Sequence, residues 1–130
     1  MVNNLKNTFT KEERLSWKRH IDLLFEKGQS FIAFPLRVIF LPCSEEHPVP
    51  ASILVSVSKR KFKRAVKRNR VKRQIREAYR LNKHDLINHL AATDKTIFLA
   101  FLYLDNEIKP YSNVEKAMKK ALKVLQEKYV

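Results

Sequence analysis

The stretch ASILVSVSKRKFKRAVKRNRVKRQIREAYRLN, residues 51–82, changes its hydrophobic period near the middle. In residues 51–57 the β-branched side chains Ile53, Val55 and Val57 alternate with Ser52, Leu54 and Ser56, which predicts a half-buried strand. Further on the spacing becomes helical, and Val71, Ile75 and Tyr79 fall on one stripe. We therefore expect a strand followed by an amphipathic helix whose apolar face docks on the sheet.

A first helix is predicted upstream of this stretch. Thr10-Lys11-Glu12-Glu13 has the form of a capping box, in which the hydroxyl and the carboxylate each bind a backbone N–H. An apolar stripe from Trp17 to Phe25 follows at helical spacing, so we place the helix at residues 11–27. Gly28, the only glycine, is expected to end this helix in the left-handed conformation, which is free of strain in a residue without Cβ.

The rest of the chain predicts two more strands and two more helices. Residues 34–41 and 96–103 are β-rich, whereas the prolines in residues 42–50 predict a loop. Apolar spacing predicts a short helix over residues 83–91. A C-terminal amphipathic helix is expected to open at a second capping box, Ser112-Asn113-Val114-Glu115.

The order of these elements is αββαβα, and no internal repeat or low-complexity linker interrupts it. This order predicts one α+β domain over residues 1–130, with helices packed on a small sheet. Residues 1–9 precede the first helix and are expected to form a flexible N-terminal tail.

The composition narrows the class of partner. The chain carries 27 Lys and Arg against 13 Asp and Glu, a net charge of +14, which indicates a polyanionic partner. Cys43 is the only cysteine, so an internal disulfide and a Cys-based zinc site are excluded. No N-terminal apolar run follows a charged start, and the apolar runs are too short to span a bilayer as helices. We therefore expect a cytoplasmic protein without membrane contact.

The positive charge is concentrated in one segment. Residues 59–80 hold twelve Lys and Arg and one acid, Glu77, for a local charge of +11, while the other 108 residues carry only +3. At about 100° per residue, the apolar stripe of this helix and its basic residues fall on opposite sides. An ordinary solvated face mixes charge signs to form i,i+4 pairs, whereas this one repels itself unless phosphates bind it. The segment therefore predicts a nucleic-acid interface.

Residues 57–80 resemble the signature of the bacterial ribonuclease P protein subunit. The core of the signature is the triplet Arg68-Asn69-Arg70, followed by Val71-Lys72-Arg73 and Ile75-Arg76-Glu77, with an aromatic residue at Tyr79. Its position between a strand and the rest of a helix makes the resemblance more specific than a basic tripeptide alone.

The resemblance extends over most of the chain. A first helix ending in Leu24-Phe25-Glu26-Lys27-Gly28, the apolar strands and the C-terminal helix fall in the order of this family. One departure lies between the strand and the triplet, where many members have a glycine and this chain has Phe62-Lys63-Arg64. The resemblance implies a ribosomal-protein-S5-domain-2-like sandwich with a left-handed strand–helix–strand crossover, against the usual hand.

The resemblance also implies a function. Members of the family are protein partners of a catalytic RNA, which uses Mg²⁺ to hydrolyse the phosphodiester between the 5′ leader and the body of precursor tRNA. The expected partners are this ribonuclease P RNA and precursor tRNA, with no role for DNA. We expect the protein itself to carry no catalytic residue and to bind no cofactor or metal.

Two sets of side chains are expected to contact RNA. The set predicted to bind RNA is Lys59, Arg60, Lys61, Arg68, Asn69, Arg70, Lys72, Arg73, Arg76 and Arg80. A cleft for the leader, between the first helix and the sheet, is expected to involve Ile21, Phe25 and the often aromatic strand position, which aligns with Ile39 or Phe40. Unpaired bases stack on aromatic side chains whatever their sequence. Packing of the first helix explains Phe25 equally well, because this residue lies on the apolar stripe.

Three other classes of protein have a basic surface of this kind. A self-sufficient nuclease needs clustered carboxylates or a positioned histidine, but the four histidines are scattered along the chain without an acidic cluster. A DNA-binding helix-turn-helix protein would have a short helix, and not a strand, before its basic helix. Composition alone does not exclude the third class, a structural RNA-binding protein similar to a ribosomal protein.

Overall fold

The computed structural model describes residues 13–43 and 49–129, which form one α+β domain. Its helices and strands are α1 (Lys18–Lys27), β1 (Gln29–Ala33), β2 (Leu36–Cys43), β3 (Ala51–Ser56), α2 (Ala65–Asn82), α3 (His84–Ala92), β4 (Thr96–Tyr103) and α4 (Tyr111–Val124). A π-helical turn, Leu125–Tyr129, follows α4 directly. The predicted strand before the basic segment, the basic helix and the C-terminal helix are thereby confirmed.

The strands form one four-stranded sheet in the order β1-β2-β4-β3. β1, β2 and β4 pair in antiparallel fashion, whereas β3 and β4 are parallel neighbours. Parallel neighbours need a crossover connection, and here α2 and α3 provide it. The left-handed crossover that the resemblance implies for this unit stays a prediction.

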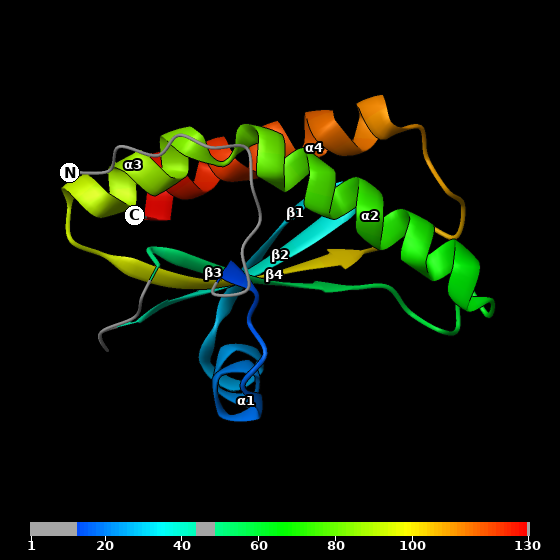
Figure 1. Ribbon diagram of the computed structural model, residues 1–130, viewed down its shortest axis with the longest axis horizontal. Helices are drawn as coiled ribbons and strands as arrows, with labels where there is room; N and C mark the ends of the chain where they lie inside the picture. Colours follow the sequence, from blue (N-terminus) through cyan, green and yellow to red (C-terminus); the bar gives the residue numbers. More distant parts are fainter. Residues whose placement is uncertain (1–12, 44–48, 130) are drawn as a thin grey trace.

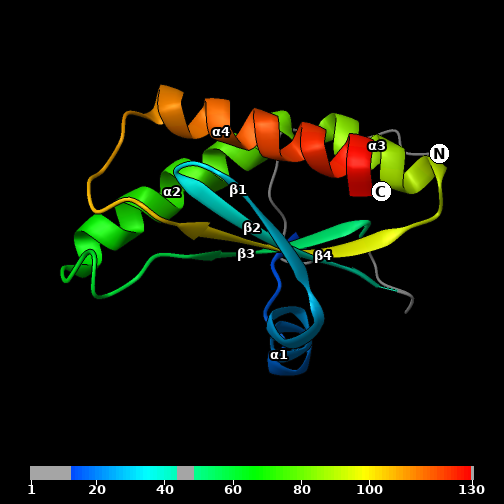
Figure 2. The same ribbon diagram turned by 180° about the vertical axis from the view of Figure 1, so that it is seen from behind.

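Helices cover both faces of the sheet. α2, α3 and α4 lie together on one face, and α1 lies alone against the other (Figures 1 and 2). Successive side chains of a strand point to opposite faces, so β4 contributes Phe101 to the larger core under α2 and α4, and Phe98 to the smaller core under α1. Both of these rings are nearly completely buried. The apolar composition of β4 therefore reflects a central strand that is covered on both sides.

The first helix is shorter than predicted. It begins at Lys18, not at residue 11, because the segment before it pairs with an edge strand. Arg14 forms a parallel bridge with Ile53 of β3, and the Leu15 N–H donates to the Ile53 carbonyl at 2.8 Å. Thr10 of the predicted capping box lies outside the described residues. Its partner Glu13 forms an ion pair with Lys83.

The predicted conformation of Gly28 was wrong. Its φ of −70° and ψ of 154° are extended, and the chain passes straight from α1 into β1. Glycine is needed here because of a close approach: a Cβ would meet the Leu24 carbonyl oxygen, the Ile39 Cγ2 atom at 2.9 Å and the Phe40 carbonyl oxygen at 3.0 Å. The helix end is thus pressed against β2, which fixes α1 on the sheet.

Candidate nucleic-acid interface

The helix α2 separates its apolar and basic residues as predicted. Its buried side chains are Val71, Ile75, Ala78 and Tyr79. The side chains of Asn69, Arg70, Arg73 and Arg76 are exposed, and those of Lys72 and Arg80 are half-buried. The same helix therefore contributes both a packed stripe and a cationic surface.

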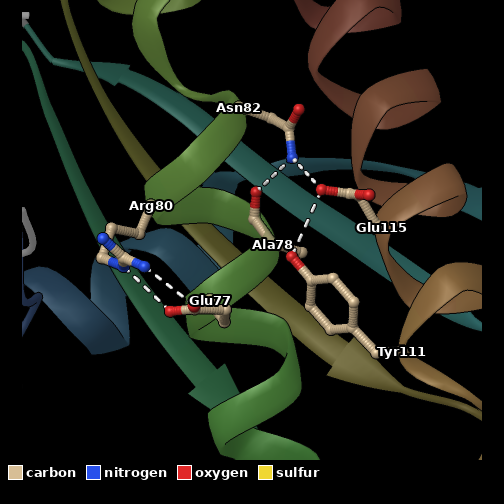
Figure 3. A network of polar contacts seen from close by, with 6 residues as sticks. All are labelled: Glu77, Ala78, Arg80, Asn82, Tyr111 and Glu115. Atoms are coloured by element: carbon tan, nitrogen blue, oxygen red, sulfur yellow. Dashed lines mark hydrogen bonds and ion pairs between the residues drawn. The ribbon is translucent and has the colours of Figure 1, made fainter. Parts of the chain in front are cut away.

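Polar contacts fix α2 against α4 (Figure 3). The Asn82 Nδ2 atom donates to the Ala78 carbonyl at 2.8 Å and to Glu115 Oε2 at 3.2 Å. The Tyr111 hydroxyl donates to the same Glu115 oxygen at 3.3 Å, and burial together with this carboxylate raises the pKa of Tyr111 to about 12. Glu115 therefore joins the two helices and does not cap α4, whose first residue follows Pro110 without a side-chain cap.

A shallow hollow of about 260 Å³ runs along the exposed side of α2. We call its lining the α2 stripe, which is the exposed side of the helix and not its buried apolar side. It consists of Asn69, Arg73, Arg76, Glu77 and Arg80. Arg80 donates from Nε and Nη2 to the two Glu77 carboxylate oxygens, both at 2.8 Å (Figure 3). These hydrogen bonds lower the pKa of Glu77 and raise that of Arg80. The charge of Arg80 is locally balanced, so Arg73 and Arg76 dominate the positive charge of the stripe.

A second groove, of about 580 Å³, lies beside the first turn of α2. The residues that line it are Lys61, Phe62, Lys63, Arg64, Lys67, Arg70, Asn106, Glu107 and Ile108. Lys61 also donates to the Leu104 carbonyl, which joins the β3–α2 connection to the β4–α4 connection. Lys61 and Arg70 are among the predicted RNA contacts, while Lys63, Arg64 and Lys67 line the same groove and were not selected from the sequence, although all three lie in the basic segment. The predicted contacts Lys59 and Arg60 are exposed in the same connection.

Arg68, the first residue of the triplet, has a distinct position. Its Nη1 atom donates to the carbonyls of Phe62 and Lys63, both at 2.8 Å, and its side chain is half-buried. The guanidinium therefore holds the β3–α2 connection against the first turns of α2. We expect Arg68 to support RNA binding by positioning this connection and its lysines.

This geometry separates Arg68 from Arg73 experimentally. We expect Arg68→Ala to lower the free energy of unfolding by about 1–3 kcal/mol, because charged hydrogen bonds to two carbonyls are lost. Arg73→Ala should leave unfolding unchanged, yet flatten the dependence of log affinity for RNA on log salt by about 0.9 unit. Urea unfolding and RNA titrations at several salt concentrations measure both quantities. If Arg68→Ala flattened the salt dependence as much as Arg73→Ala does and left the free energy of unfolding unchanged, the positioning role would be wrong.

The residues expected in a leader cleft fall on two different faces of the sheet. We use "α1 face" for the side of the molecule formed by α1, with Trp17 before it, and by the sheet surface under α1, which carries Ile39, Phe98 and Ala100. Ile21 packs on this face, while Phe25 in the last turn of α1 is 46% exposed.

Of the two alternatives on β2, only Ile39 lies on the α1 face. Phe40 is 2% exposed and belongs to the larger core under α2 and α4. Its ring packs against Phe31 and Tyr129, at centroid distances of 6.0 and 4.7 Å. The expectation that Phe40 lines a surface beside α1 is therefore corrected, because the alternation along β2 turns this ring to the opposite face.

The α1 face also carries aromatic residues that are not among the predicted site residues. The rings of Trp17 and His20 stack at a centroid distance of 5.1 Å, and the His20 ring lies 4.7 Å from that of Phe98. Trp17 and His20 were visible as members of the first helix's apolar stripe. Their contact with Phe98 joins segments far apart in the chain, so local periodicity could not predict it.

Within residues 13–43 and 49–129, no group of three or more His, Cys, Asp or Glu side chains is placed to hold a metal ion. None of the helices in these ranges is both long and apolar enough to cross a membrane.

Fold and surface together define a class of protein: a small α+β domain whose positive charge is concentrated on one helix and the connection before it. The family model for ribonuclease P matches residues 9–126. The ribonuclease P protein component of Porphyromonas gingivalis is 45% identical over 113 residues, which cover 87% of this chain and 82% of that protein. The chain belongs to the ribonuclease P protein family, whose members are the protein components of a ribonucleoprotein endoribonuclease in tRNA processing. Membership implies ribonuclease P RNA as a partner.

Solved structures of more distant sequences share the fold. The ribonuclease P protein of Thermotoga maritima matches with a TM-score of 0.65 at 22% identity, covering 85% of this chain and 96% of that one. The Staphylococcus aureus ribonuclease P protein matches with a TM-score of 0.67 at 19% identity, covering 86% and 94%. The four-stranded mixed sheet with helices on both faces is therefore the fold of this family.

Proposed function

We propose that the protein uses two separate surfaces in 5′ maturation of tRNA. The α2 stripe and the adjacent basic groove bind phosphates of ribonuclease P RNA, while the α1 face binds the unpaired 5′ leader of precursor tRNA. The observation that carries this proposal is the opposite character of the two faces. One is polycationic, as recognition of a structured RNA backbone requires, and the other exposes aromatic side chains, as recognition of unpaired bases requires.

The proposed contribution to catalysis is electrostatic and positional. Catalysis and the Mg²⁺ that it needs reside in the RNA subunit. Two RNA molecules repel each other through their phosphates, and a segment with a local charge of +11 offsets part of that repulsion. High concentrations of Mg²⁺ also reduce this repulsion. We therefore expect the protein to accelerate cleavage most when the Mg²⁺ concentration is low.

Leader binding is tested at Phe25. We expect Phe25→Ala in the reconstituted holoenzyme to weaken binding of precursor tRNA with a leader by about 5- to 150-fold, the equivalent of one lost base stack. Binding of mature tRNA, which has no leader, should not change. Equilibrium binding of both RNAs gives this comparison directly.

A matched control keeps this test specific. Ile32→Ala removes another exposed apolar side chain, 63% exposed against 46% for Phe25, from β1, and should alter neither affinity. Unfolding of Phe25→Ala must first be compared with wild type, since α1 packing is the alternative role of this ring. An equal loss of affinity for both RNAs would contradict leader binding at Phe25.

A further inference from the structure

A column of three aromatic rings on the α1 face ends in solvent. Phe98 at its base is 1% exposed, and the His20 ring packs on it with an interplanar angle of 30°. The Trp17 indole stacks on His20 at an interplanar angle of 20° and is 69% exposed. The column therefore leads from the core of the protein to the widely exposed indole of the chain's only tryptophan.

The position of Trp17 is held in place by the structure beneath it. Its carbonyl accepts the first backbone hydrogen bond of α1, from the Ile21 N–H at 3.0 Å. A single exposed apolar side chain is common on protein surfaces, but this one is oriented by stacking on a ring that itself rests on the core. An oriented ring loses less conformational entropy on binding than a mobile one.

Trp17 also extends a stripe of α1. Trp17, Ile21 and Phe25 are spaced four residues apart, so they follow one another along the helix. The two ends of this stripe are exposed, and at 1.5 Å per residue they are separated by about 12 Å. This length corresponds to roughly three stacked nucleotides at about 3.4 Å each. The exposed Lys18 beside Trp17 adds positive charge for phosphates at this end.

We propose that the Trp17 indole is a stacking platform for an unpaired base of the 5′ leader. This inference rests on the proposed binding of the leader to the α1 face and adds a second aromatic contact about 12 Å from Phe25. Stacking on an indole uses the face that every base shares, so this contact tolerates changes of leader sequence. Trp17 thus sets the length of leader that the protein reads, and not its sequence.

The single tryptophan allows a direct test in the holoenzyme. We expect its fluorescence to be quenched when precursor tRNA with a leader of at least five nucleotides binds, and to be unchanged when mature tRNA binds. Trp17→Ala should weaken binding of the leader-bearing RNA by about 5- to 150-fold and leave binding of mature tRNA intact. Trp17→Phe, which keeps an aromatic face, should retain most of the affinity, while Ile32→Ala should match wild type.

The outcomes separate this inference from the proposed function. If leader-bearing RNA binds more tightly than mature tRNA but neither changes the fluorescence nor depends on Trp17, the inference is overturned and leader binding stands. If the wild-type holoenzyme binds leader-bearing and mature tRNA equally tightly, the proposed leader binding and the inference about Trp17 are both wrong. Shortening the leader to one or two nucleotides should abolish the quenching, and quenching that persisted would place another part of the RNA on Trp17.

Discussion

Replacing Arg73 and Arg76 together with glutamine is expected to weaken binding of ribonuclease P RNA by about 100-fold, because each charged hydrogen bond to phosphate contributes about 1.5 kcal/mol or more. Both guanidinium groups are exposed on the α2 stripe, whereas the Glu77 carboxylate in this stripe pairs with Arg80. The dependence of log affinity on log salt should flatten by about two units, since two fewer counterions are released. Filter binding or fluorescence anisotropy across a range of salt concentrations measures both effects.

A control of equal charge distinguishes a site from a general attraction. Lys116 and Lys120 are exposed on α4, and their joint replacement by glutamine removes the same two positive charges from another surface. We expect this control to change affinity far less than the pair on α2. Equal losses from both double variants would show that net charge alone drives binding, and would contradict a defined interface on α2.

The second large effect is expected on stability, at the ion pair between Lys83 and Glu13. The Lys83 Nζ atom lies 2.6 Å from Glu13 Oε2, and the two side chains are 8% and 10% exposed. Lys83→Met removes the ammonium group next to the buried Glu13 carboxylate, and breaking a buried pair from one side in this way costs about 3–5 kcal/mol. Urea unfolding of the full chain measures the loss.

Two further variants test the cause of this loss. Adding Glu13→Gln to Lys83→Met should recover much of the stability, because a neutral amide then replaces the buried carboxylate of Glu13. Lys109→Met breaks the more exposed pair with Asp105 and should have a much smaller effect. If Lys83→Met were no more destabilising than Lys109→Met, the buried pair would not be what holds the segment before α1 to the junction of α2 and α3.

The local sequence predicted α2 well because the apolar and the basic positions both lie within this one helix. Its apolar residues recur at helical spacing while the positions between them are basic, so both faces are visible in one stretch of 18 residues. The packed stripe and the cationic surface could therefore be assigned together. Arg68 is the exception, since its carbonyl partners Phe62 and Lys63 lie in an irregular connection whose path no periodicity describes.

The errors arise where a distant segment decides the structure. The start of α1 depends on pairing of Arg14 and Leu15 with Ile53 of β3, which a capping pattern cannot reveal. The strand β1 was missed because QSFIA is short and mostly exposed at the sheet edge, and its pairing with β2 defines it. The choice between Ile39 and Phe40 likewise depends on which face of β2 meets α1, which alternation alone leaves open.

The most direct test of the central claim is reconstitution of the protein with a bacterial ribonuclease P RNA. Cleavage of precursor tRNA is measured at low and at high Mg²⁺, with each component alone as a control. We expect the protein to accelerate 5′ cleavage strongly at low Mg²⁺, to matter less at high Mg²⁺, and to cleave nothing without the RNA. Cleavage by the protein alone would contradict catalysis in the RNA, and tight RNA binding without faster cleavage at any Mg²⁺ would favour a purely structural RNA-binding role.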